Sequence, residues 1–347
     1  MKEEKQRNIA FDILRILSAV SIIIMHITDG NIYSSPVKGS VFWQSALLNS
    51  ISHFGVPVFV MISGALFLAP GYKLNLKRLW LHNILRLCIV YIVWSFAYGI
   101  YDYSSYGGGF KQLIWCAVIG RPHLWFLPMI IGIYIILPFM VTWVRNASVK
   151  EIRLFILLFF IFNIVCETIK AFKAAEIITF ILDLRNIQLV CSYVGYFIIG
   201  YYIVHIGLEK KFRKLLYCAG MISGILSAIS VILLSNIAGT PNMYIVDSYS
   251  IFTFFWSAAI FTFVFEKAGN KTYGKHTELF WGNIGKDTLG LYLCHLGIIE
   301  IIYPIRDFCG SLPVIPGFLL YTLIIAVIGL GLGAGLRRIP FIGRYIC

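Results

Sequence analysis

The sequence predicts an all-α, polytopic membrane protein, and its composition, its apolar runs and the placement of its charges each indicate that fold class. The chain of 347 residues is 59% hydrophobic and only 13% charged, with a mean hydropathy of +0.83. Because about a quarter of the residues in a soluble domain are charged, this composition is typical of a chain that lies in lipid. No stretch outside the apolar runs is long enough for a soluble domain, so we expect residues 1–347 to form a single membrane domain.

Ten apolar runs are candidate spans, since a helix needs about 20 residues to cross the hydrocarbon core. The segment 101–122 differs from the other connections, because its apolar stretch 113–119 is too short to span and predicts a re-entrant or interfacial element. The expected spans are residues 9–27, 43–69, 84–100, 123–143, 152–169, 188–206, 215–238, 248–266, 288–303 and 316–335.

The basic residues predict how these spans are oriented. If the N-terminus is cytoplasmic, the inner segments carry 20 lysines and arginines and the outer segments carry 7, while Arg15 and Arg86 lie within spans. Cytoplasmic loops are enriched in these residues, so we expect about ten transmembrane helices with both termini cytoplasmic. The same loop placement accounts for the net charge of +13, and without a basic stripe or helix nucleic acid is not an expected partner.

The cysteines and the first apolar run exclude two other interpretations. The eight cysteines show no CxxC or Cys/His spacing, so the sequence predicts no disulfide framework and no metal site. The first run contains Asp12 and Arg15 and is not followed by a small-residue cleavage pattern. We therefore expect it to be a mature helix and not a signal peptide.

Ionisable residues inside the first span indicate a functional site. The segment "RILSAVSIIIMH" begins with Arg15 and ends with His26, which lie within about 20° of one helical face and about 16 Å apart along the axis. Asp12 is one turn before Arg15 and can form an ion pair with it. Charged groups within a span are costly and often mark function, although a structural pair and an interfacial histidine would give the same pattern.

Three further spans carry polar residues in their apolar runs. His53 and the pair Ser63-Gly64 belong to "HFGVPVFVMISGALFL", where small residues are also expected for close helix packing. His123 opens the fourth span, and Tyr292 and His295 lie in "TLGLYLCHLGIIEIIY". With His26, four histidines therefore fall in the predicted outer halves of four different spans.

Five motifs in this order resemble the membrane acyltransferase 3 family, in particular its bacterial O-acetyltransferases of surface glycans such as enterobacterial common antigen. The resemblance runs from residue 9 to about residue 300. The motifs are "FDILRILSAVSIIIMH", "HFGVPVFVMISGALFL", "HLWFLPMIIGIYIILP", "YVGYFIIGYYI" and "TLGLYLCH".

The resemblance assigns family motifs to particular positions. The family signature of Arg or Lys, ten residues and then His corresponds to Arg15 and His26. The family's Ser-Gly pair corresponds to Ser63-Gly64, its "HLWFL" to His123 through Leu127, and its "YLIH"-like end to Tyr292 through His295.

The resemblance implies transfer of an acetyl group from acetyl-CoA to a hydroxyl of a cell-envelope glycan or lipid-linked saccharide, in the bacterial cytoplasmic membrane. His26 would be the general base and Arg15 would bind the CoA phosphates. His295 and Ser63 are secondary catalytic candidates, and an acyl-enzyme on Ser63 is an alternative to direct transfer. Relatives often have Arg where this chain has His53. The further residues assigned to donor binding are Asp12, His53, His123 and Tyr292.

Two other classes of protein are alternatives. A proton-coupled transporter would use Asp12, Arg15, His26, His295 and Glu300 as an intramembrane relay. A non-catalytic membrane sensor or scaffold would need none of these residues for chemistry. Membrane lipid is an expected partner in every case, and the sequence leaves homo-oligomer formation open.

Overall fold

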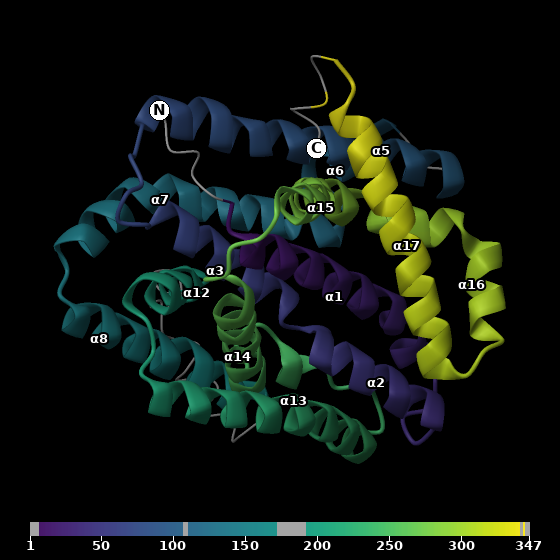
Figure 1. Cartoon of the computed structure of the whole chain (residues 1–347). Helices are drawn as coiled ribbons and strands as arrows, with labels where there is room; N and C mark the ends of the chain where they lie inside the picture. The colour runs from purple at the N-terminus through teal and green to yellow at the C-terminus, as the bar shows by residue number, and fades with distance from the viewer. Residues whose placement is uncertain (1–6, 107–109, 172–191, 341–342, 344–347) are drawn as a thin grey trace.

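The computed structural model describes residues 7–106, 110–171, 192–340 and 343, and within them the chain forms helices and no strand (Figure 1). The all-α, polytopic class predicted from the sequence is therefore confirmed. The helices are α1 (Ile9–Ser34), α2 (Ser40–Ser52), α3 (Gly55–Phe67), α4 (Leu76–Arg78), η1 (Leu79–Ile84), α5 (Leu85–Tyr106), α6 (Phe110–Ile119), η2 (Pro122–Trp125), α7 (Phe126–Asn146), α8 (Val149–Phe159), η3 (Phe160–Val165), α9 (Cys166–Ala171), α12 (Val194–Tyr201), η4 (Tyr202–Ile206), α13 (Lys210–Ala238), η5 (Tyr244–Val246), α14 (Ile251–Ala268), α15 (Lys275–Ile301), α16 (Tyr303–Gly310) and α17 (Val314–Arg337).

Every predicted span overlaps an observed helix. Within the described residues, eight helical stretches are long and apolar enough to cross a membrane. There are nine if α15 and α16, which are bent by 82° relative to each other, count as one span. The predicted span 188–206 lies partly outside the described residues and is represented there by the shorter apolar helix Val194–Ile206. The eight stretches are Ile9–Ser34, Ser40–Phe67, Leu76–Ser105, Pro122–Asn146, Val149–Ala171, Lys210–Ala238, Tyr244–Ala268 and Val314–Arg337.

Helix α1 lies in the middle of the molecule and contacts α2, α3, α14, α15 and α17 (Figure 1). Its N-terminus is capped by Asn8, whose side chain accepts a hydrogen bond of 3.1 Å from the amide of Ala10. The small residues Ser18 and Ser21 face Gly55 of α3, where even one added methyl group would meet them. Close packing around α1 encloses this segment within the protein.

The pair α3 and α12 forms a second close contact. Gly64 of α3 lies against the backbone of Phe197, and Gly200 of α12 lies against the backbone of Met61. The absence of a side chain at both glycines lets the two helices approach, as small residues do in membrane proteins. The packing interpretation of the Ser63-Gly64 pair is therefore confirmed for Gly64.

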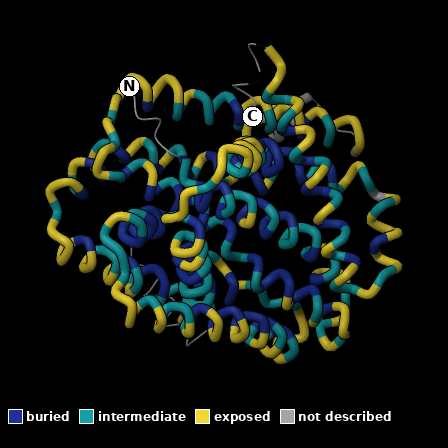
Figure 2. Tube along the Cα trace, in the orientation of Figure 1, coloured by how far each residue is buried: buried dark blue, intermediate teal, exposed yellow. Residues whose placement is uncertain are grey.

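Buried residues are concentrated along the central helices (Figure 2), and many large apolar side chains are exposed on the outside of the bundle. Phe139, Ile237 and Val327 are 77%, 82% and 62% exposed, which suits side chains that contact lipid. The apolar stretch 113–119 belongs to the short helix α6, which folds back on α5. There the Tyr91 hydroxyl donates to the carbonyl oxygen of Ile119 at 2.5 Å. The prediction that this stretch does not span is thus confirmed.

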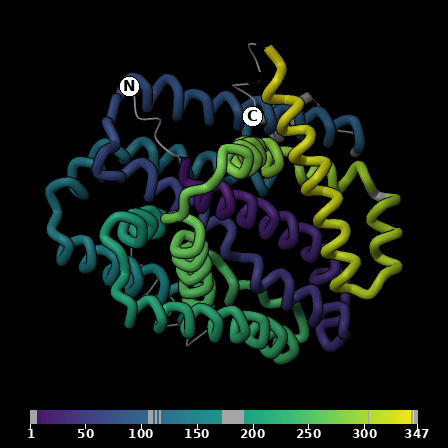
Figure 3. The backbone as a smooth tube through the Cα atoms, viewed as in Figure 1, coloured from purple at the N-terminus to yellow at the C-terminus, as the bar shows by residue number. Residues whose placement is uncertain are grey.

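The start of α1 and the end of α17 lie at the same end of the molecule, because both are tied to α15 (Figure 3). Arg7 donates to the carbonyl oxygen of Gly282 at 3.0 Å, and Arg337 forms an ion pair of 2.8 Å with Asp287. Termini at the same end agree with the predicted topology of ten spans, because an even number of crossings returns the chain to the side where it began. That this end faces the cytoplasm stays a prediction from the charge bias.

Candidate active site

A cavity lined by cations lies at the end of the molecule where α1 begins. Its volume is about 610 Å³, within the range of small-molecule sites, and its polar lining includes Ser63, Tyr134 and Thr288. No carboxylate is among its lining residues in the described part of the chain. We call it the basic cavity, after five cationic side chains that line it: Arg7, Arg15, Arg86, Lys286 and Arg337.

Asp12 orients two of these cations from behind. Its carboxylate is 1% exposed and accepts hydrogen bonds from Arg7 Nε at 2.6 Å and from Arg15 Nη1 at 2.8 Å. The close approach of Gly285 on α15 leaves room for the Asp12 side chain. The predicted pair of Asp12 and Arg15 is confirmed, and Asp12 supports the cavity wall without lining it.

The basic cavity has a neighbour that continues its positive lining. This second cavity has a volume of about 460 Å³ and shares Arg86 and Tyr134 with the first. Arg78 and His82 add to its lining, and His82 lies in the π-helical turn η1. A phosphate-rich ligand that enters the basic cavity therefore has a second basic surface beside it.

Three of the four predicted histidines lie close together beside Tyr292, although none of them lines the basic cavity itself. The rings of His26 and His295 have centroids 5.3 Å apart, and those of His123 and His295 are also 5.3 Å apart. Tyr292, which lines the basic cavity, has its ring centroid 5.9 Å from that of His295 and donates a hydrogen bond to the backbone oxygen of His123. We call His26, His123 and His295 the histidine cluster.

The backbone sets the hydrogen-bonding role of His295. Its Nδ1 lies 2.5 Å from the carbonyl oxygen of Tyr292, an acceptor, so Nδ1 is assigned the proton. In the neutral ring Nε2 then keeps a lone pair, and this atom has no hydrogen-bond partner among the described residues. Because buried polar atoms are rarely left unpaired, the Nε2 atom of the fully buried His295 is a candidate for contact with a substrate.

His26 is held by a network that the sequence did not reveal. Its Nδ1 lies 3.4 Å from Asp29 Oδ2, and Asp29 Oδ1 accepts a hydrogen bond of 3.1 Å from the amide of the buried Asn49. The side-chain Oδ1 of Asn49 lies 2.8 Å from Nε2 of His53. His53 is thus linked to His26 through two residues, and it does not line the basic cavity. The spacing of Asp29 three residues after His26 could have indicated their contact.

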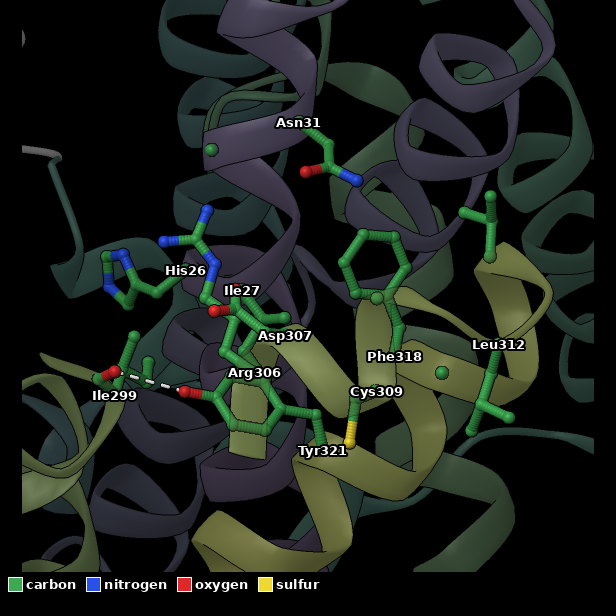
Figure 4. A pocket seen from close by; sticks show the side chains of 14 residues that line it. His26, Ile27, Asn31, Ile299, Arg306, Asp307, Cys309, Leu312, Phe318 and Tyr321 are labelled. Atoms are coloured by element: carbon green, nitrogen blue, oxygen red, sulfur yellow. Dashed lines mark hydrogen bonds between the residues drawn. The ribbon is translucent and has the colours of Figure 1, made fainter. Parts of the chain in front are cut away.

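Another cavity is lined by His26 of the histidine cluster (Figure 4). It has a volume of about 420 Å³ and lies between α1, the end of α15, α16 and α17. The His26 side chain, 26% exposed, lines it, and the Tyr321 hydroxyl fixes one wall by donating to the carbonyl oxygen of Ile299 at 3.0 Å. We call it the His26 cavity. The two cavities lie toward opposite ends of α1, because Arg7 and Arg15 line the basic cavity and His26 and Asn31 line the His26 cavity. The histidine cluster therefore lies between them.

Arg121 ties together the elements that carry His123 and His295. Its guanidinium pairs with Asp102 of α5 and, at 2.7 Å, with Glu300 of α15, while its Cζ lies 4.6 Å from the centroid of the Tyr98 ring. Burial alone would lower the pKa of Arg121, but the hydrogen bonds to Asp102 and Glu300 raise the pKa above its ordinary value. The guanidinium therefore stays charged, and Glu300 acts as its partner at this end of the site.

Ser63 lines the basic cavity on the α3 side. Its hydroxyl donates to the carbonyl oxygen of Phe59 one turn earlier at 3.2 Å, and no histidine of the described chain hydrogen-bonds to it. The described residues also contain no group of three or more His, Cys, Asp or Glu side chains arranged to hold a metal ion.

The helices, the two cavities and the buried histidines between them define a polytopic membrane protein with a polar site enclosed by its spans. The chain belongs to the membrane acyltransferase 3 family, because the family model described as an acyltransferase domain matches residues 8–333. That match contains every site residue predicted from the sequence. Comparisons with curated proteins and with solved structures found no match. The chain is therefore a multi-pass membrane acyltransferase.

Proposed function

We propose that this acyltransferase moves an acetyl group from acetyl-CoA to a hydroxyl of a cell-envelope glycan or lipid-linked saccharide, in the bacterial cytoplasmic membrane. The observation that carries the proposal is the pair of cavities with the histidine cluster between them. A donor and an acceptor from different sides of a membrane require two such entrances.

The basic cavity suits the donor. CoA carries phosphate groups at one end and a thioester at the other, and guanidinium groups match phosphate geometry well. Arg15 lies at the cation-lined end, and Tyr292 lies where this cavity meets the histidine cluster. Arg15 and His26 are about 16 Å apart along α1, which is comparable to the length of a pantetheine arm. An acetyl group at the end of that arm would reach the histidines while the phosphates stay with the arginines.

His26 is the proposed general base. A neutral imidazole accepts the proton of the sugar hydroxyl as the hydroxyl oxygen attacks the carbonyl carbon of the thioester. The carbon–sulfur bond then breaks, and the CoA thiolate takes the proton from His26, so that the imidazole is neutral again. Asp29 orients the imidazole through these steps because its carboxylate faces Nδ1. The Nε2 atom of His295 can accept a hydrogen bond that orients the hydroxyl beside His26.

Direct transfer is favoured over an acyl-enzyme on Ser63. A serine nucleophile needs a base within hydrogen-bonding reach, whereas the Ser63 hydroxyl donates to its own helix backbone. Family membership also favours acyl transfer over the transporter alternative. Two acidic members of the proposed transporter relay, Asp12 and Glu300, are each paired with an arginine.

The first test measures donor binding and acetyl transfer with purified protein in nanodiscs, radiolabelled acetyl-CoA and a membrane glycan extract. Arg15→Ala should weaken acetyl-CoA binding about tenfold or more, since a charge-assisted contact with phosphate is lost. His26→Ala should bind acetyl-CoA normally and lower transfer by about 100- to 10,000-fold, the usual contribution of a general base.

The exposed His276 provides the matched control, because His276→Ala removes an imidazole outside both cavities and should behave as wild type. If Arg15→Ala and His26→Ala both bind donor and transfer acetyl like wild type, the proposed roles of these residues are wrong.

A further inference from the structure

The His26 cavity contains a cation that the transfer reaction does not use. Arg306 belongs to α16, the short helix that bends away from α15, and its side chain lines the cavity. Its Nη2 atom lies 3.5 Å from the position that a Cβ atom would occupy on Gly30. Because Gly30 is four residues after His26 on α1, the guanidinium lies about one helical turn beyond the imidazole, on the same face.

The remaining lining suits a saccharide. Phe318 and Tyr321 of α17 provide aromatic surface, and Asn31 and Asp307 provide groups that hydrogen-bond with hydroxyls (Figure 4). Tyr321 is held in place by its hydrogen bond to the Ile299 carbonyl oxygen. The volume of about 420 Å³ lies within the range of small-molecule pockets.

Two basic groups line this cavity, the His26 imidazole and the Arg306 guanidinium (Figure 4). The imidazole marks the point where a hydroxyl must lie for proton transfer. A guanidinium forms paired hydrogen bonds with a carboxylate or phosphate. Asp307, the next residue in α16, repels an anion and so favours its placement on the Arg306 side.

We infer that the His26 cavity is the acceptor subsite and that it selects an acidic saccharide. The sugar hydroxyl to be acetylated lies at His26, and a carboxylate or phosphate on the same or the next sugar lies at Arg306, about one helical turn away. This inference rests on the proposed function, because it assigns the acceptor of that reaction.

The test is equilibrium binding of methyl glucuronide, methyl glucoside and methyl glucoside 6-phosphate to the full chain in phosphatidylcholine nanodiscs. Wild type should bind the glucuronide and the phosphate about tenfold or more tightly than the neutral glucoside. Arg306→Gln should abolish this preference, and Arg306→Lys should keep part of it, because lysine keeps the charge and loses the planar fork.

The matched control is Lys38→Gln, which removes one exposed positive charge from another predicted outer segment and should keep the acidic preference. Equal binding of acidic and neutral glycosides by wild type, or binding of none of them, would overturn the inference. So would a preference that Arg306→Gln leaves unchanged.

Two further measurements on the same samples distinguish a lipid ligand from a saccharide and the acceptor site from the donor site. If phosphatidylglycerol in the nanodisc, and not the glucuronide, binds in an Arg306-dependent way, the site takes a lipid headgroup and the saccharide inference is wrong. Acetyl-CoA binding is measured in parallel, because its absence in wild type would contradict the proposed function and not the acceptor assignment alone.

Discussion

At the scale of single residues, His26 depends on groups that do not line either cavity. Asp29 faces its Nδ1 atom at 3.4 Å, and Asn49 fixes Asp29 with a hydrogen bond of 3.1 Å. Asn49 is 1% exposed and is itself held by the hydroxyl of Thr28 at 2.9 Å. A base that is oriented in this way presents its Nε2 atom to the substrate, so Asp29 is a positioning residue for the proposed reaction.

Replacement of Asp29 by asparagine tests this role. The change keeps the size of the side chain but removes the negative charge that faces His26, so Asp29→Asn should lower acetyl transfer by about tenfold or more. Acetyl-CoA binding should not change, because Asp29 lies away from the basic cavity. The measurement is the kcat and the KM of acetyl transfer, since the loss of a positioning residue should lower kcat and leave the KM for acetyl-CoA unchanged.

The exposed Asp247 offers a control of the same chemistry outside both cavities, so Asp247→Asn should leave transfer unchanged. Values of kcat and KM for Asp29→Asn that match those of wild type would contradict the positioning role.

At the scale of helices, the site depends on close contacts that hold α1 and α3 in place. Gly64 and Gly200 let α3 and α12 touch through their backbones, and Ser63, next to Gly64, faces the basic cavity as a result. Arg121 also holds helices together, because it joins α5 to α15 through its ion pairs with Asp102 and Glu300. The positions of the histidines are therefore set by contacts between helices far apart in sequence.

Gly64→Ala tests the contact between α3 and α12. The added methyl group would overlap the backbone of Phe197, so the helices must separate, at a cost of about 1–3 kcal/mol. We expect a lower thermal unfolding midpoint for the detergent-solubilised protein. Gly132→Ala in α7 is the matched control, because an added Cβ there meets no atom within 4 Å. Equal midpoints for the two variants would show that the contact is less tight than described.

At the scale of the whole molecule, the positive-inside bias of 20 to 7 agrees with the way the helices are arranged. Arg7, Lys286 and Arg337, all predicted to be inner residues, line one cavity. Arg306, predicted to be an outer residue, lines the cavity beyond the histidine cluster. The charge bias and the two cavities therefore agree: the basic cavity is on the predicted cytoplasmic side and the His26 cavity is on the predicted outer side.

Cysteine labelling tests this direction. Lys38→Cys should react with a membrane-impermeant maleimide added to intact cells, whereas Lys73→Cys should react only after the membrane is opened, because Lys38 is predicted to be outside and Lys73 inside. Both residues are exposed, so accessibility differs only through sidedness. The parental protein gives the background labelling of the native cysteines. Labelling of Lys73→Cys in intact cells would contradict the predicted cytoplasmic position of Lys73.

The spans and the chemical types of the site residues could be predicted because each depends on local sequence. Ten apolar runs, the pair of Asp12 and Arg15 and the common face of Arg15 and His26 all follow from helix geometry. Helix α15 begins at Lys275, whereas the predicted ninth span begins at residue 288. Residues 275–287 are too polar for hydropathy to include them in a span.

Contacts between distant helices could not be predicted in the same way. Asn49 reaches Asp29 from α2, and Arg337 joins the basic cavity from the end of α17. The bend between α15 and α16, which brings Arg306 to His26, also has no counterpart in hydropathy. Each of these depends on how helices pack, and the pattern along one helix contains no information about its neighbours.

The most direct measurement is transfer across a sealed membrane. The protein is reconstituted in liposomes that enclose a membrane-impermeant glycan acceptor, and radiolabelled acetyl-CoA is added outside only. If the donor enters through the basic cavity and the acceptor through the His26 cavity, the enclosed glycan becomes acetylated, and His26→Ala liposomes show no product. If acetyl-glycan forms only when acetyl-CoA and glycan are on the same side, the two cavities do not serve two sides of the membrane, and the division between them is wrong.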